Sequence, residues 1–160
     1  MSVRVDPYCY PGTNVPVNNA GFRLQTELDL FEADAVLLAA ASLNLSPITG
    51  QFDQARLLET HRRLFHPVYA WAGQLRQNTG RMAKLRESGR VISCGPSEHV
   101  PAALAAVFAD LNEDRYLCEL DATDLAERVG FYYSEIDAIH PFREGNSRTL
   151  RVFFPDLCRA

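Results

Sequence analysis

Five segments with apolar residues at helical spacing, set apart by proline and glycine, constrain the fold of this chain most. In the first segment Leu28, Phe31, Ala35 and Leu38 recur every three or four residues, which predicts one apolar helix face. The expected helices span residues 24–45, 53–65, 100–112 and 125–139, and a fifth runs from 146 past 154. The sequence therefore predicts an all-α fold, a small helical bundle.

Two stretches lack this periodicity. Residues 1–22 hold three prolines and two glycines, which is typical of an extended, turn-rich arm. Four glycines punctuate the second stretch, and its part 80–92 is predicted to be an exposed turn or hairpin, inside a flap at residues 76–92. No repeat or linker divides the chain, so residues 1–160 are expected to form a single domain.

Composition argues against several classes of protein. A membrane-spanning helix needs about 18 uninterrupted apolar residues, and no window holds them. A secretory signal has an apolar run after its positively charged start, and none follows the first arginine here. A cytoplasmic protein is expected. Sixteen basic and twenty acidic residues give a net charge of −4, which argues against a nucleic-acid-binding protein that depends on bulk positive charge.

The segment that carries chemistry runs from residue 139 to 151, Ile-His-Pro-Phe-Arg-Glu-Gly-Asn-Ser-Arg-Thr-Leu-Arg. His140 precedes a proline, which disfavours helical backbone angles and places it in a loop. Gly145 permits a positive φ or a close approach by a ligand. Because a helix is expected to begin at Asn146, its free N–H groups and positive dipole end would face the loop. This predicts an anion-binding site.

Charged side chains near this helix start indicate which anion binds. Arg148 and Arg151 share a helix face, and cations there oppose the helix dipole unless an anion of several charges is bound. Glu144 offers one oxygen ligand, which suits Mg²⁺ held mainly by phosphates. His140 is suited to remove a proton, since the ordinary pKa of histidine is about 6.5. These groups predict phosphoryl or nucleotidyl transfer.

From His140 to Arg151 the sequence resembles the signature of the Fic family, His-Pro-Phe-x-Asp/Glu-Gly-Asn-Gly-Arg-x-x-Arg. The one departure is Ser147, which replaces the second glycine; serine is tolerated near a helix start, so activity is expected to survive. The resemblance continues through residues 6–14, 71–76 and 131–138. It implies the helical Fic fold, with an active-site loop at 139–151 and a short β-hairpin flap.

By this resemblance the protein is an adenylyltransferase that moves AMP from ATP to a serine, threonine or tyrosine hydroxyl of a target protein. His140 would deprotonate the hydroxyl, and Glu144 would bind Mg²⁺. The residues implied in binding the phosphates are Gly145, Asn146, Ser147, Arg148 and Arg151.

The flap is basic in an acidic protein. It holds five basic residues and one acid: Arg76, Arg81, Lys84, Arg86 and Arg90, with Glu87. By resemblance the flap aligns the target backbone as an added strand, through Lys84, Leu85 and Arg86. The alternative is a solvated loop with scattered charge.

Many Fic proteins carry an inhibitory helix with the pattern Ser/Thr-x-x-x-Glu-Gly/Asn. Thr123 and Glu127 have this spacing, but Arg128 follows. The resemblance therefore implies a toxin whose inhibitor is a separate antitoxin, with a glutamate on a helix that reaches Arg151. The expected target is the ATPase subunit of a type II topoisomerase.

Two other functions stay open. A phosphotransferase of the Doc type would move the γ-phosphate, but Doc-like motifs differ at the position of Gly145. A catalytically silent ATP-binding or interaction module would result if Ser147 abolished turnover. Of the other histidines, His66 precedes a proline without the rest of the motif, and His61 and His99 are expected at the surface.

Overall fold

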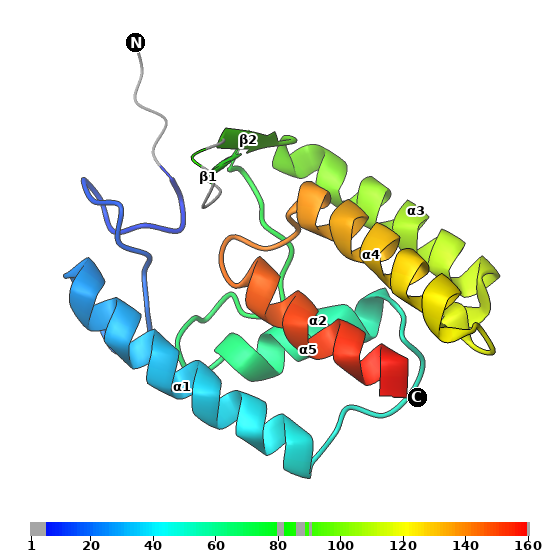
Figure 1. Ribbon diagram of the computed structural model, residues 1–160. Coiled ribbons are helices and arrows are strands. Elements are labelled where there is room, and N and C mark those ends of the chain that lie inside the picture. The colour runs from blue at the N-terminus through cyan, green and yellow to red at the C-terminus, as the bar shows by residue number, and fades with distance from the viewer. Residues whose placement is uncertain (1–5, 80–81, 86–88, 90, 160) are drawn as a thin grey trace.

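The computed structural model describes residues 6–79, 82–85, 89 and 91–159, with only the backbone at 84, 85 and 92. Helices dominate these residues, and their one β-sheet is a two-stranded hairpin, so the predicted fold class is confirmed (Figure 1). The elements in chain order are α1 (Gln25–Leu45), α2 (Gln54–Phe65), β1 (Met82–Leu85), β2 (Val91–Cys94), a 3₁₀ turn (Ser97–His99), α3 (Val100–Glu113), a second short turn (Arg115–Leu117), α4 (Ala122–Ile139) and α5 (Asn146–Arg159).

Two aspartates fix the starts of α2 and α4. The carboxylate of Asp53 accepts a hydrogen bond from the N–H of Arg56 at 2.9 Å. Asp121 accepts from the N–H groups of Thr123 and Asp124 at 2.8 and 3.0 Å. Each such cap contributes about 1 kcal/mol to stability. Because Asp121 caps the helix, α4 begins at residue 122 rather than at the expected 125.

α2 lies at the centre of the bundle, in contact with α1 and α5, and α3 packs against α4 (Figure 1). One apolar cluster joins α2 to α3, α4 and α5 and includes Leu57, Ile136 and Phe142. A second cluster joins α1, α2 and the N-terminal arm and includes Phe65. The loop between α4 and α5 lies where the two clusters meet, because Phe142 belongs to the first and Gly145 lies against Phe65 of the second.

The hairpin is antiparallel, with Met82 opposite Cys94 and Leu85 opposite Val91. It ends two residues beyond the predicted 80–92. Within residues 6–22 there is no helix or named strand, only turns and a single bridge between Cys9 and Pro16.

α1 is apolar on both faces. Leu28 and Val36 are buried, whereas Leu30, Leu37 and Leu38 are 73 %, 70 % and 72 % exposed. The prediction that Leu38 lies on the buried face is wrong, because leucines all round a helix leave no single stripe for the periodicity to identify. No helix among the described residues is long and apolar enough to cross a membrane.

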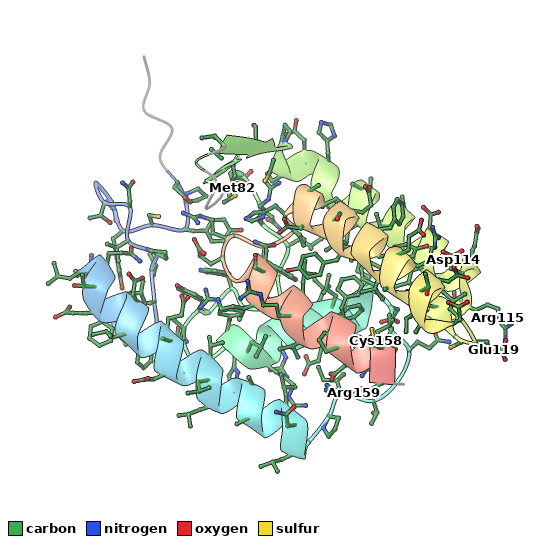
Figure 2. All side chains as sticks on the ribbon, viewed as in Figure 1. Met82, Asp114, Arg115, Glu119, Cys158 and Arg159 are labelled. Carbon is green, nitrogen blue, oxygen red and sulfur yellow. The ribbon has the colours of Figure 1, made fainter. Side chains whose placement is uncertain are left out.

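The turn between α3 and α4 lies far from the hairpin residue Met82 (Figure 2). Arg115, Tyr116 and Leu117 adopt left-handed backbone angles in succession, with φ of 53°, 54° and 62°. Arg115 also pairs with Glu119 at 3.1 Å across this turn. This charged and strained turn is separate from the loop that follows α4.

Candidate active site

His140 ends α4 in a left-handed conformation, with φ 53° and ψ 64°. Its N–H donates to the carbonyl of Ile136 at 3.0 Å, which closes the last turn of the helix. A left-handed residue other than glycine is uncommon, and Pro141 contributes to it here because it disfavours the helical region for the residue before it. The chain therefore leaves the helix at His140, as predicted, and enters the loop.

Arg76 holds this exit in place. Its side chain is buried, and its backbone N–H donates to the carbonyl of Pro141 at 2.9 Å. The guanidinium donates to four oxygens from both ends of the hairpin and the end of α4: Thr79 Oγ1 (2.9 Å), Gly95 O (2.7 Å), Ile139 O (3.3 Å) and His140 O (2.6 Å). It thereby satisfies carbonyls that a helix C-terminus leaves without an intrahelical partner.

Arg76 was counted among the basic residues of the predicted flap at 76–92, but its buried side chain supports the loop instead. Arginine is rarely buried unless it is paired, and the sequence around Arg76 does not show the carbonyls that accept from it. Its position at the end of a segment that resembles Fic proteins, residues 71–76, was the only signal available.

Asn146 closes the loop on itself. Its side-chain oxygen accepts from the N–H of Phe142, and its side-chain nitrogen donates to the carbonyl of Phe142, both at 2.9 Å. Phe142 is fully buried in the first cluster, so the loop is tied to the core. Since the Asn146 side chain is engaged in this way, what it offers an anion is its backbone N–H at the start of α5.

Gly145 is required at its position for two reasons. Its φ of +79° favours glycine, and a β-carbon there would lie 2.3 Å from the ring of Phe65. Its carbonyl accepts from both the N–H and the hydroxyl of Thr149 at 2.9 Å, which starts the hydrogen bonding of α5. The close approach of loop and ring brings the start of α5 against α2.

His61 of α2 contacts the loop from the core and is completely buried. Its Nδ1 accepts from the N–H of Gly73 at 2.8 Å, so Nε2 carries the proton and donates to the carbonyl of Glu144 at 3.0 Å. The ring stacks on Phe142 with centroids 3.8 Å apart. Burial lowers the pKa of His61 to about 4, which keeps the imidazole neutral near pH 7.

The expectation of a surface histidine at His61 is therefore wrong, while His99 is exposed as expected. Leu57, His61 and Leu64 lie at positions i, i+4 and i+7 of α2, and all three are buried. This spacing on an apolar helix face was the signal that could have placed His61 inside.

Glu144 lies in the loop, and its side chain is 42 % exposed. Arg143 donates to it at 3.0 Å and also pairs with Asp6 of the N-terminal arm at 2.8 Å. Burial raises the pKa of the Glu144 carboxyl; Arg143 and Arg148 oppose this, and Glu32 adds to it. The arm thus takes part in holding the one acidic side chain of the loop.

The two arginines of α5 differ in their surroundings. Arg148 packs over the ring of Phe65, 4.8 Å from its centroid, and pairs with Glu32 of α1. Arg151 is exposed, and no acidic side chain pairs with it among the residues that the structure describes. Ser147, between the loop and Arg148, is half-buried.

Three further predicted residues belong to the flap. Lys84 and Leu85 lie in β1, where their backbones pair with Ile92 and Val91. Arg86 lies outside the described residues. The structure thus brings His140, Glu144 and the start of α5 together in one loop, and it places the predicted target-binding segment in the hairpin that Arg76 joins to that loop.

A model of the Fic/DOC family matches residues 51–158, more than half of the chain. The chain belongs to the Fic/DOC family. The resemblance drawn from the loop sequence is thus confirmed. The matched residues include the whole loop but neither Asp6 nor Glu32, which reach the Fic site from the arm and from α1.

Two curated relatives and one solved structure illustrate the similarity. The probable protein adenylyltransferase y4lH of Sinorhizobium fredii is 37 % identical over 156 residues, which are 96 % of this chain and 76 % of that protein. The protein adenylyltransferase VbhT of Bartonella schoenbuchensis is 33 % identical over 96 % of this chain, which spans only 31 % of VbhT. The N-terminal Fic domain of a VirB-translocated Bep effector of Bartonella quintana, solved with bound ADP, is 25 % identical with a TM-score of 0.81, covering 95 % of this chain and 75 % of that chain.

Proposed function

We propose that this protein is an adenylyltransferase that moves AMP from ATP to a hydroxyl group of a target protein. One observation carries the proposal: His140 and the N-terminus of α5 belong to a single short loop that Asn146 and Arg76 hold in place. A base is thereby fixed beside a site for a polyanion. The names of y4lH and VbhT and the bound ADP of the B. quintana domain support this reading.

In the proposed reaction the target hydroxyl oxygen bonds to the α-phosphorus while the bond to the oxygen that bridges to the β-phosphate breaks. His140 accepts the hydroxyl proton, and pyrophosphate leaves. The backbone N–H groups of Gly145, Asn146 and Ser147 stabilise the charge on the α-phosphate, as oriented amides do in other transfer reactions. Arg148 and Arg151 hold the β- and γ-phosphates.

Glu144 is the residue that would hold Mg²⁺. No group of three or more His, Cys, Asp or Glu side chains able to hold a metal exists among the described residues. A single half-exposed carboxylate beside a phosphate site fits an ion that takes most of its ligands from phosphates and water. When bound, the ion would neutralise part of the phosphate charge.

The hairpin would align the target. A target segment that adds to β1 along Lys84, Leu85 and Arg86 would form backbone hydrogen bonds, as in other strand-addition complexes. Because Arg76 joins the two ends of the hairpin to the carbonyl of His140, a segment aligned on the hairpin is also positioned relative to the base.

The proposal extends to a toxin with a separate antitoxin. Arg151 is exposed at the side of α5, where a glutamate from another protein can reach it. Such a carboxylate would occupy the place of the γ-phosphate. The target proposed for this toxin is the ATPase subunit of a type II topoisomerase.

Label transfer tests the activity. The purified protein is incubated with Mg²⁺, bacterial lysate or the purified topoisomerase subunit, and ATP labelled at the α-phosphate. Wild type should label a protein band, and His140→Ala should label it about 10²–10⁴-fold more slowly, because a general base contributes that much.

His66→Ala is the matched control, because His66 also precedes a proline but is exposed at the end of α2. It should label as wild type does. Equal labelling by His140→Ala would refute the role of His140. Transfer of label from the γ-position alone would establish the phosphotransferase alternative.

A further inference from the structure

Glu32 reaches the candidate site from α1, outside the part of the chain that matches the family. Its side chain is only 12 % exposed. One carboxylate oxygen pairs with the guanidinium of Arg148, and the other accepts a hydrogen bond from the hydroxyl of Tyr69. Both oxygens are thus engaged, and no other acidic side chain in the described part of the chain pairs with Arg148.

Tyr69 is a rigid support for this carboxylate. It is 2 % exposed and stacks on Trp71 with ring centroids 4.4 Å apart. Its hydroxyl bonds the carboxylate oxygen that does not pair with Arg148, so both partners together fix the orientation of the Glu32 carboxylate. Phe65 also restricts Arg148, because the guanidinium lies over its ring.

The position of Arg148 is thus set on two sides, by the carboxylate of Glu32 and by the ring of Phe65. A nucleotide that binds at the start of α5 would meet an arginine whose position is already set.

We propose that Glu32 is a positioning residue for the nucleotide, which holds Arg148 against Phe65 so that its remaining N–H groups are oriented for the terminal phosphates of ATP. This inference rests on the proposed use of Arg148 as a phosphate ligand. A free arginine side chain loses rotamer freedom when it is immobilised. Because Glu32 already restricts the rotamers of Arg148 in the folded protein, less of this entropy is lost when the nucleotide binds.

The opposite possibility is that Glu32 competes with phosphate for Arg148 and so inhibits the protein. The two roles predict opposite signs for the effect of removing the carboxylate on ATP affinity. The guanidinium has five N–H donors, and the pair with Glu32 uses one end of it, so Glu32 and a phosphate can bind Arg148 at the same time. The hydrogen bond from Tyr69 also favours positioning. An inhibitory carboxylate would have to reach into the phosphate site, and Tyr69 holds Glu32 where it is.

Calorimetric titration with MgATP and, separately, with AMP distinguishes these roles. Glu32→Gln removes the charge but keeps the size of the side chain, and it should weaken MgATP binding about tenfold while AMP binding changes less than twofold. Only ATP carries the phosphates that Arg148 would hold. Glu32→Asp, which keeps the charge, should recover part of the affinity, and Glu27→Gln, which removes an exposed charge from the same helix, should bind as wild type does.

A double-mutant cycle shows whether Glu32 acts through Arg148. Adding Glu32→Gln to Arg148→Gln should cause no further loss of ATP affinity. Unchanged or tighter MgATP binding by Glu32→Gln overturns the proposal, and so does an equal loss for ATP and AMP. If Glu32→Gln does not fold, the same comparison is made with Tyr69→Phe, which frees the carboxylate from its anchor and should weaken MgATP selectively.

This test is independent of label transfer. A wild-type protein that binds MgATP but transfers no AMP would refute the proposed activity and leave the titrations interpretable. A wild-type protein that transfers AMP, with a Glu32→Gln variant that binds MgATP normally, would refute only the role of Glu32.

Discussion

Alanine at position 145 would place a methyl group in steric clash with the ring of Phe65. The β-carbon would lie 2.3 Å from the nearest ring carbon, and the residue would keep a φ of +79°. The left-handed conformation costs a residue other than glycine about 1–2 kcal/mol, and a methyl group forced into a packed core costs about 1–3 kcal/mol more. Gly145→Ala should therefore lower the free energy of unfolding by about 2–5 kcal/mol.

Two other glycines separate these costs. Gly12 has a φ of +74° with no atom near its β-position, so Gly12→Ala should lose only the backbone part, about 1–2 kcal/mol. Gly130 lies inside α4 with open space around it, so Gly130→Ala should gain about 0.5–1 kcal/mol. Urea denaturation followed by circular dichroism measures all three.

Relief of the clash provides the decisive check. Phe65→Leu shortens the opposing side chain, so the double variant with Gly145→Ala should lose less stability than the two single changes added together. Label transfer by Gly145→Ala should fall as well, since the loop and the start of α5 have to move. The reasoning is refuted if Gly145→Ala loses no more stability than Gly12→Ala.

The buried imidazole of His61 predicts a pH dependence of stability. As the pH falls from about 6.5 toward 4, the unfolded chain takes up a proton at His61 that the folded chain does not, so the free energy of unfolding should fall by up to about 3 kcal/mol. His61→Gln should lack this part of the pH dependence in denaturation curves, and parallel curves for the two proteins would contradict the assignment. Arg76→Lys should cost about 2–4 kcal/mol of stability, because an ammonium cannot reach all four oxygens that accept from the guanidinium among the described residues, and it leaves buried carbonyls unsatisfied. It should also slow label transfer more than it weakens MgATP binding, since Arg76 contacts the His140 carbonyl and not α5; an unchanged transfer rate would show that His140 does not depend on this clamp.

The helices were predictable because their signals are local. Periodic apolar residues indicate a helix wherever it packs, and Asp53 and Asp121 mark helix starts whatever surrounds them. The face that a helix buries depends on its neighbours, so Leu38 was placed on the wrong side of α1. The sequence identified the hairpin but not its ends, since strand limits depend on the partner strand.

The loop was predictable for a similar reason, because its chemistry lies in a dozen consecutive residues. Its supports come from elsewhere: Glu32 from α1, His61 from α2, Arg76 from the segment before the hairpin, and Asp6 from the arm. Each contacts the loop through a pairing that exists only after folding, so a motif does not reveal it. The catalytic and phosphate-binding roles of the loop residues themselves stay predictions.

The guanidinium of Arg76 joins the hairpin to the loop. It donates to Thr79 and Gly95, which flank the hairpin, and to the carbonyls of Ile139 and His140, where α4 passes into the loop. Thr79 and Gly95 lie just outside β1 and β2, so these bonds hold the two ends of the hairpin together as well as to the loop. Under the proposed function, one side chain thus sets the distance between the segment that aligns the target and the base that takes its proton.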